Sequence, residues 1–288
     1  MMQSAHVRAM VDAAKATVSS LGLGAYDAVV LHASNRVTMR LTPADVVARV
    51  APMSNHANVE FEIDVARRLA ETDSPVATLD PRLEPRAYEH DGFVMNLWTW
   101  HKPASHSEIA PAEYALALQR LHAGLREIDL PAPRFTDRIA EAQRLVDDRE
   151  LTPELAEPDR AFLGDALRDL RWAIEKRGAV EQLLHGEPHP GNLLMTKDGP
   201  LFIDFETVCR GPVEFDIAHV PDEVSEHYSG VDLDLLRECR MLVLAMVASW
   251  RWDRDDQFPN GRQMGIDMLG QLRETLDRHP VGTPRHPA

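Results

Sequence analysis

The sequence predicts an α+β fold in two lobes, a β-rich N-terminal lobe over residues 1–97 and a mainly helical lobe over residues 98–288. Three observations predict this fold. Short stretches containing β-branched residues, separated by polar residues, fill much of the first hundred positions. Apolar residues recur at helical spacing through most of the remainder. An Asp-Gly pair between two extended arms marks a hairpin in each lobe.

The predicted N-terminal lobe consists of short strands, one helix and a hairpin. The three strands are expected at Tyr26–Leu31, Arg36–Leu41 and Asp45–Val50. The helix is indicated by Phe61, Val65 and Leu69, which recur at helical spacing. The hairpin spans Arg86–Trp98 and turns at Asp91-Gly92. These elements form a small sheet with a helix against it.

The predicted C-terminal lobe is helical apart from one hairpin. Two sets of apolar residues at helical spacing predict amphipathic helices, the second ending near Gly178: Leu116, Leu121 and Leu125, then Phe162, Leu163, Leu167 and Leu170. A largely buried helix is expected over Leu233–Trp250. The hairpin is LLMTKDGPLFIDF, two apolar arms around Asp198-Gly199.

Composition limits the classes of function. The net charge of −15 disfavours nucleic-acid binding, which depends on clustered Lys and Arg. No apolar run is long enough to cross a membrane or to serve as a signal peptide, and the two cysteines, Cys209 and Cys239, form no disulfide framework. These features predict a cytoplasmic protein. They do not choose between a monomer and a homodimer. Acidic residues outnumber basic ones between Glu214 and Asp256. They form either a solvated face or a surface that binds a cationic substrate.

The segment HGEPHPGNLLMTKDGPLFIDFE, residues 185–206, carries the predicted chemistry. Asn192 and Asp204 each lie six positions from Asp198, so a hairpin centred there brings both to its open end. Opposed Cα atoms in paired strands are about 4.5 to 5.5 Å apart. One carboxylate and one amide oxygen suit Mg²⁺, which takes its other ligands from water and substrate phosphates. A nucleoside triphosphate is the expected substrate.

Glu187 is the candidate general base. It lies five residues before Asn192, in a loop that contains glycine and two prolines. A carboxylate at such a position accepts the proton of an attacking hydroxyl, while phosphoryl transfer otherwise depends on positioning and charge neutralisation.

These motifs resemble those of the aminoglycoside phosphotransferase family, which shares the fold of protein kinases. HGEPHPGN followed by IDFE is similar to the HGDxxxxN and IDxE signature, and CRGPVEFDIA resembles the GPxxxDLA continuation of that family. The resemblance implies a bilobal protein-kinase-like fold and transfer of the γ-phosphate of ATP or GTP, with Mg²⁺, to a hydroxyl of a small-molecule acceptor. Family acceptors include antibiotics, sugars and choline-like amines, so the natural role is either antibiotic resistance or metabolism.

Carried over to this sequence, the resemblance assigns roles in the catalytic loop. Glu187 takes the catalytic-base position, and Asn192 and Asp204 take the two magnesium positions. His185 takes a loop-organising position beneath the base, and Asp216 is structural.

In the N-terminal lobe, the resemblance assigns residues to the nucleotide. Val46–Arg49 resembles the strand that normally ends in a phosphate-anchoring lysine, with Glu62 as its partner on the helix. Arginine keeps the charge but presents a planar fork. The loop over the phosphates has no glycine and consists of His32, Ala33, Ser34 and Asn35. Adenine is expected against Met95 to Leu97.

Glu187 stands where the family has aspartate, and one extra methylene displaces the carboxylate by roughly a bond length. A misplacement of about 1 Å costs on the order of a hundredfold in rate. Three outcomes follow: a slower kinase, a kinase whose acceptor hydroxyl lies further back, or a kinase-fold protein that binds nucleotide with weak or no transfer.

A separate alternative treats four residues as ligands of a transition metal in a hydrolase or cupin-like oxygenase: His185, Glu187, His189 and Asp204. The absence of HExxH and PCxxC motifs disfavours it, and the absence of GxxxxGK[ST] excludes a Walker-type site.

Overall fold

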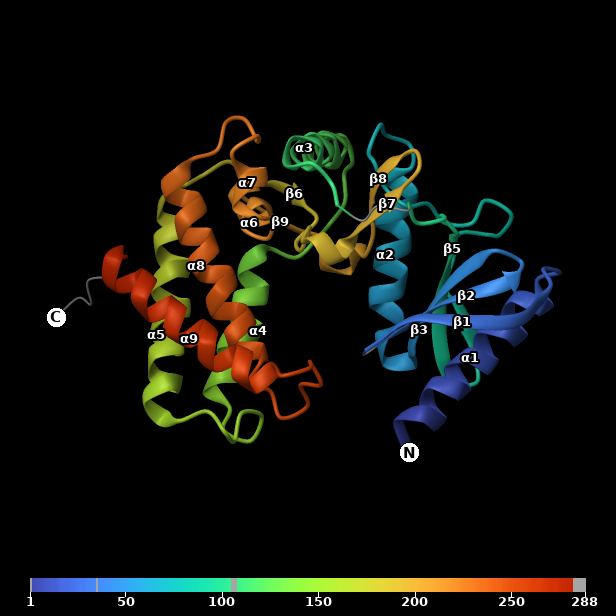
Figure 1. The fold of residues 1–288 in the computed structure, drawn as a ribbon, viewed down its shortest axis with the longest axis horizontal. Helices are drawn as coiled ribbons and strands as arrows, with labels where there is room; N and C mark the ends of the chain where they lie inside the picture. Colours follow the sequence, from blue (N-terminus) through green and yellow to red (C-terminus); the bar gives the residue numbers. More distant parts are fainter. Residues whose placement is uncertain (1, 35, 105–107, 282–288) are drawn as a thin grey trace. The chain divides into compact units, whose positions relative to one another are not determined.

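The computed structural model describes residues 2–34, 36–104 and 108–281 (Figure 1). The chain forms two compact units. The sheet unit comprises Met1–Leu130 and Pro190–Thr207, and the helical unit comprises Pro131–His189 and Val208–Ala288. The division by compactness therefore differs from the predicted lobe boundary after residue 97, because both the following helix and the hairpin of residues 193–202 pack within the sheet unit.

The sheet unit is built on a five-stranded antiparallel sheet in the order β1-β2-β3-β5-β4. Its strands are β1 (Ala25–Ala33), β2 (Val37–Pro43), β3 (Val46–Pro52), β4 (Tyr88–His90) and β5 (Phe93–Thr99). The three predicted strands and the first hairpin are thus confirmed within one or two residues at each end. At the hairpin turn both Asp91 and Gly92 have positive φ (47° and 81°), as the Asp-Gly pair predicts for a two-residue turn.

Helix α1 (Met2–Ser20) was not predicted and packs across one face of this sheet (Figure 1). Its buried residues Met10, Ala13, Ala14 and Val18 join the core formed by alternate strand residues such as Val46, Ala48 and Val50. Two of these four buried apolar residues are alanines, which give a weak apolar pattern in sequence. The prediction of a single helix in this region was therefore wrong.

Helix α2 (His56–Leu69) lies on the opposite face of the sheet, preceded by the short helix η1 (Met53–Asn55). Asn55 occupies the N-cap position without a side-chain hydrogen bond. Because side chains alternate across a strand, the odd-numbered positions of β3 point toward α2 while the even-numbered ones enter the α1 core.

The remainder of the sheet unit consists of α3 (Pro111–Glu127), η2 (Pro190–Asn192), η3 (Phe205–Thr207) and the hairpin β7 (Leu193–Thr196) and β8 (Gly199–Phe202). Phe202 anchors this hairpin: its backbone N–H donates to the carbonyl of Pro75, and its ring lies 6.1 Å from that of Tyr114 on α3. Leu121 and Leu125 are buried as predicted, but Leu116 is 57% exposed, so its placement on the buried face was wrong.

The helical unit is organised around α8 (Leu233–Trp250), which coincides with the predicted helix and packs against α4, α5, α6 and α9 (Figure 1). The other helices are α4 (Phe135–Asp147), α5 (Glu157–Lys176), α6 (Val213–Ile217), α7 (Asp222–Ser225) and α9 (Gly261–Arg278). Helix α5 ends two residues before Gly178, where φ is 59°. Within the described ranges, no helix is long and apolar enough to cross a membrane.

A two-stranded ribbon, β6 (Gln182–Leu184) and β9 (Cys209–Gly211), lies within this helical unit. It was not predicted, because each strand is only three residues long. The ribbon brings the loop that follows β6 beside α6, which follows β9.

Candidate functional site

A charged cluster lies between the sheet and α2 in the sheet unit. Arg49 on β3 and Asn96 on β5 are paired positions of neighbouring strands, and both side chains meet Glu62 on α2. The Glu62 side chain is 0% exposed and also accepts a hydrogen bond of 2.9 Å from Arg36 Nη1. The bond from Asn96 Nδ2 is 2.8 Å. A buried carboxylate requires such partners, because an unpaired one would be strongly destabilising.

The same two arginines extend the cluster to the segment after β8. Arg49 Nη2 lies 2.9 Å from Asp204 Oδ1, and Arg36 Nη2 forms an ion pair with Glu206. Three carboxylates thus share two guanidinium groups. Burial would lower the pKa of Arg49. The negative charges of Glu62 and Asp204 outweigh burial, and the pKa of Arg49 is raised above its ordinary value. Burial and the Asp204 charge raise the pKa of Glu206 above its ordinary value.

Asn192 and Asp204 lie at the open end of the β7–β8 hairpin, but the predicted register is wrong by one residue. Leu193 pairs with Phe202, and the N–H of Ile203 donates to the carbonyl of Asn192 at 3.0 Å. The loop consists of residues 197 and 198, with Gly199 at φ 115° already paired to Thr196. Asp204 adopts a left-handed conformation, φ 69°, which aspartate tolerates better than most residues.

The helical unit holds Glu187 in the loop after β6. His185, fully buried, and Gly186 donate their backbone N–H groups to the two carboxylate oxygens of Asp216 on α6, each at 2.8 Å. The Glu187 N–H donates to His185 Nδ1 at 3.4 Å. Asp216 and His185 therefore fix the backbone that presents Glu187.

Arg138 on α4 is the ion-pair partner of Glu187, and it also donates to the carbonyl of Gly186 at 3.3 Å. Burial would raise the pKa of Glu187, but the adjacent Arg138 guanidinium outweighs it, and the pKa lies below its ordinary value. His219, nearby, has its pKa lowered by burial to about 4, in spite of the opposing charge of Glu187. At neutral pH Glu187 is thus ionised and His219 is neutral.

The other predicted residues that the structure describes lie at the surface or in the core, outside the charged cluster. Ser34 is exposed and its N–H donates to the carbonyl of Arg36, while Asn35 lies outside the described residues. The side chains of Met95 and Leu97 lie in the core between the sheet and α1, and the Leu97 carbonyl accepts from Asp80 N at 3.0 Å. Two of the acidic residues predicted on the surface, Glu214 and Asp216, are buried.

Sequence reasoning did not identify Arg36, Glu206 or Arg138, and it included Asn96 only within the stretch expected against adenine. Glu206 is the last residue of the IDFE motif and Arg36 lies two positions after Ser34, so proximity to predicted site residues was their available signal. Arg138 lies 49 positions from Glu187 in a helix without a motif. In the part of the chain that the structure describes, no group of three or more His, Cys, Asp or Glu side chains is arranged as a metal centre.

Known proteins show where this architecture recurs. An amicoumacin kinase solved with AMP-PNP and Ca²⁺ is 13% identical, with 97% of each chain covered and a TM-score of 0.69. An APH enzyme in complex with GDP and kanamycin is 15% identical, with 92% of this chain and 98% of that chain covered and a TM-score of 0.65. A choline kinase from Streptococcus pneumoniae is 14% identical, with coverage of 92% and 98% and a TM-score of 0.66. A search of curated proteins gives no match.

At these identities the solved structures establish the fold, which is α+β and protein-kinase-like, as predicted. The family is established separately, by a family model that matches residues 28–237. That match includes the whole charged cluster, the Glu187 loop and the hairpin. The chain therefore belongs to the phosphotransferase enzyme family, as a kinase that transfers phosphate to an alcohol group of a small molecule.

Proposed function

We propose that this kinase transfers the γ-phosphoryl group of ATP or GTP to a hydroxyl of a small acceptor, with Glu187 as base and Mg²⁺ held by Asn192 and Asp204. The observation that carries the proposal is the position of Arg49, which contacts both Glu62 and Asp204. In this arrangement one guanidinium, oriented by a fully buried carboxylate, lies beside the residue proposed to hold the metal. Such a fixed cation suits the phosphates of a nucleotide.

The residues at the proposed metal position fit Mg²⁺ by their chemistry. Asn192 and Asp204 both offer oxygen ligands, and the bond from Ile203 N–H to the Asn192 carbonyl ties their backbones together. The Asp204 side chain is 28% exposed, so it is accessible to a hydrated ion. When bound, Mg²⁺ would supply positive charge against the charge on the transferring phosphates.

Glu187 has the properties of a base for this reaction. Its carboxylate is ionised at neutral pH and 23% exposed, and the buried contacts of His185 with Asp216 hold its loop. In the proposed step the acceptor hydroxyl proton moves to Glu187. The acceptor oxygen forms a bond to the γ-phosphorus, and the bond from that phosphorus to the bridging oxygen breaks, leaving its electrons on the nucleoside diphosphate.

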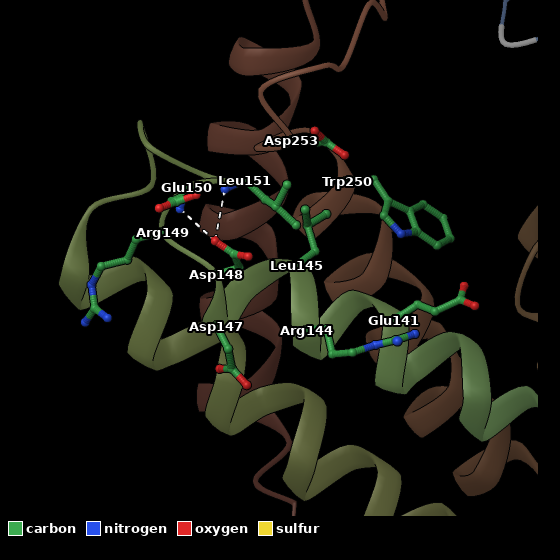
Figure 2. Close-up of a pocket in the computed structure, with 10 residues that line it drawn as sticks. All are labelled: Glu141, Arg144, Leu145, Asp147, Asp148, Arg149, Glu150, Leu151, Trp250 and Asp253. Carbon is green, nitrogen blue, oxygen red and sulfur yellow. Dashed lines mark hydrogen bonds between the residues drawn. The ribbon is translucent and has the colours of Figure 1, made fainter.

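We further propose that the acceptor carries a positive charge. Helix α4, the segment after it and the end of α8 surround an open hollow of about 960 Å³ (Figure 2). Five acids line it together with two arginines and Trp250: Glu141, Asp147, Asp148, Glu150 and Asp253. Acidic side chains and an aromatic face are the groups that attract an organic cation.

The hollow adjoins the residues around the base through α4. Glu141 lies three positions after Arg138, one turn along the helix. Trp250, which lines the hollow, faces the Arg138 guanidinium at 5.4 Å from ring centroid to Cζ. This continuity favours the hollow as the place where a cationic part of the acceptor binds.

The first experiment is a calorimetric titration of ATP and of GTP with and without Mg²⁺. The test variant is Asp204→Asn, because asparagine tolerates the left-handed backbone at this position while removing the charge. The matched control is Asp198→Asn in the exposed turn of the same hairpin. We expect Mg²⁺-dependent binding that weakens at least about tenfold in Asp204→Asn alone. No binding of either nucleotide up to millimolar concentration contradicts the proposal.

The second experiment follows phosphate transfer from γ-labelled nucleotide to aminoglycosides, peptide antibiotics and amino alcohols, with neutral sugars for comparison. Preference for the amine-bearing compounds, with a KM for them that rises in Glu141→Gln while the nucleotide KM does not, supports the cationic acceptor. Nucleotide binding without transfer to any compound favours instead a kinase-fold protein that binds nucleotide only.

A further inference from the structure

The Glu187 side chain has a partner that its loop does not provide. Arg138, from α4, donates to Oε1 of Glu187 and to the carbonyl of Gly186, the residue just before it. Trp250 on α8 contacts the same guanidinium. The Arg138 side chain is only 14% exposed. Arg138 therefore contacts the Glu187 carboxylate, the Gly186 carbonyl and the Trp250 ring. Its planar guanidinium reaches both a side chain and the backbone of the loop.

Other titratable and charged groups around Glu187 come from each element packed against it. His219 follows α6, His189 lies in the same loop, and Asp216 belongs to α6. Asp137 on α4 and the Cys209 thiol on β9 share this environment. Asp216 accepts from two backbone N–H groups, and burial keeps His219 neutral and raises the pKa of Cys209. Among these groups, Arg138 carries the permanent positive charge.

Two roles are consistent with such a contact. A guanidinium that merely blocks the carboxylate would hold the enzyme inactive. One that fixes it would reduce the freedom of a side chain with an additional rotatable bond, at a position where roughly 1 Å matters. The contact from Arg138 to Gly186 favours fixing, because it ties the same arginine to the backbone that carries Glu187.

We propose that Arg138 is a positioning residue that holds Oε1 of Glu187 and so sets the orientation of the carboxylate that takes up the acceptor proton. The inference rests on the proposed function of Glu187 as base. It explains how a glutamate serves where the family resembled by this sequence has aspartate: the longer side chain reaches to the α4 arginine, which sets its orientation. Uptake of the proton by the Glu187 carboxylate leaves the acceptor oxygen to form the new bond to phosphorus, while the bond from that phosphorus to the bridging oxygen of the nucleotide breaks.

The kinetic test compares Arg138→Met and Arg138→Lys with the wild type, using the acceptor identified by the transfer screen. For Arg138→Met we expect kcat to fall about 10- to 100-fold with the nucleotide KM unchanged, and the acid limb of the kcat/KM profile to move to higher pH. Arg138→Lys should restore part of kcat because it keeps the charge. The control Arg168→Met, which removes an exposed arginine paired with Asp165, should leave all three quantities unchanged.

A second measurement does not depend on activity. Titration of the ¹³C-labelled glutamate carboxyls by NMR gives the pKa of Glu187, whose signal is identified by its loss in Glu187→Gln. We expect this pKa to rise in Arg138→Met and to be unchanged in Arg168→Met. An unchanged pKa, or an increase of kcat in Arg138→Met, overturns the inference.

The two proposals fail in different ways. If the wild type phosphorylates no acceptor, the proposed function fails while the NMR titration still reports on the pair. If transfer occurs, the double variant Glu187→Asp with Arg138→Met decides: non-additive losses in kcat support action through Glu187, and additive losses contradict it.

Discussion

The charged clusters of the two units treat their central carboxylates differently. In the sheet unit Glu62 is fully buried and receives two arginines and the Asn96 amide. In the helical unit Glu187 is paired with Arg138, and its side chain is 23% exposed. A fully buried carboxylate held by several donors suits permanent orientation of the arginines around it. A carboxylate with access to solvent suits exchange of a proton, so Glu62 is suited to orientation and Glu187 to chemistry.

The largest effect should come from removing the negative charge of Glu187, the proposed base. Glu187→Gln keeps the size of the side chain and an oxygen for Arg138, and so should fold normally. We expect the rate of phosphoryl transfer to fall by about 10²- to 10⁴-fold, because no group then accepts the acceptor proton. Steady-state kinetics measure this loss, and calorimetry should show unchanged nucleotide affinity. A rate within threefold of the wild type would assign the base elsewhere.

Removing the negative charge of the buried Glu62 should lower the stability of the fold. In Glu62→Gln the guanidinium groups of Arg36 and Arg49 lose their common buried anion, so we expect the free energy of unfolding to fall by about 3 to 5 kcal/mol. Urea denaturation measures it. Glu60→Gln, on the exposed side of the same helix, should change it by less than about 0.5 kcal/mol. Equal losses in the two variants would mean that the cluster contributes little.

The pH dependence of stability should report on the helical unit. The pKa of His219 is about 4 in the folded protein, below the ordinary value of 6.5, so its stabilising contribution is complete above pH 6.5 and is lost as pH falls toward 4. The free energy of unfolding should decrease by up to about 3 kcal/mol over this range, at about 1.4 kcal/mol per pH unit. Urea titrations at each pH measure the slope, which should flatten in His219→Gln. The same slope in the variant would assign it to other groups.

The smallest effect should follow Arg49→Lys. Lysine keeps the charge, but a single ammonium replaces the fork that reaches both Glu62 and Asp204. We expect a loss of about 1 to 2 kcal/mol in the free energy of unfolding, with the affinity for Mg²⁺-nucleotide within threefold of the wild type. Arg40→Lys, at a partly exposed pair with Asp45, serves as the control and should change neither quantity measurably. A tenfold loss of nucleotide affinity would show that the planar fork itself binds phosphate.

The sequence predicted most of the elements and part of the site. The Asp91-Gly92 hairpin was located correctly because both residues adopt the positive φ that this pair favours. The second hairpin was displaced by one residue, since Thr196 fixes a different turn: its Oγ1 donates to the Gly199 carbonyl and accepts from Asp198 N. Asn192 and Asp204 still lie at the open end, because a slip of one residue leaves both arms ending there.

The contacts within the site were less accessible to sequence reasoning. Pairing of Arg49 with Glu62 followed from the resemblance and is seen in the structure, while their roles toward nucleotide remain predictions. Arg138 gave no pattern, because its contact with Glu187 depends on how α4 packs beside the β6–β9 ribbon. Local patterns specify elements and turns, whereas a tertiary ion pair between distant residues follows only from packing.

The hairpin that Phe202 anchors has a consequence for synthesis of the chain. The sheet unit needs residues 190–207, which emerge from the ribosome well after residue 130, with residues 131–189 of the other unit between them. At about 5 to 20 residues per second the delay is roughly 4 to 15 s. During that interval the backbone groups of Pro75 and Ala77 that pair with Phe202 await their partner. A gene split after residue 130 would therefore place Phe202 and the two backbone groups with which it pairs on separate fragments.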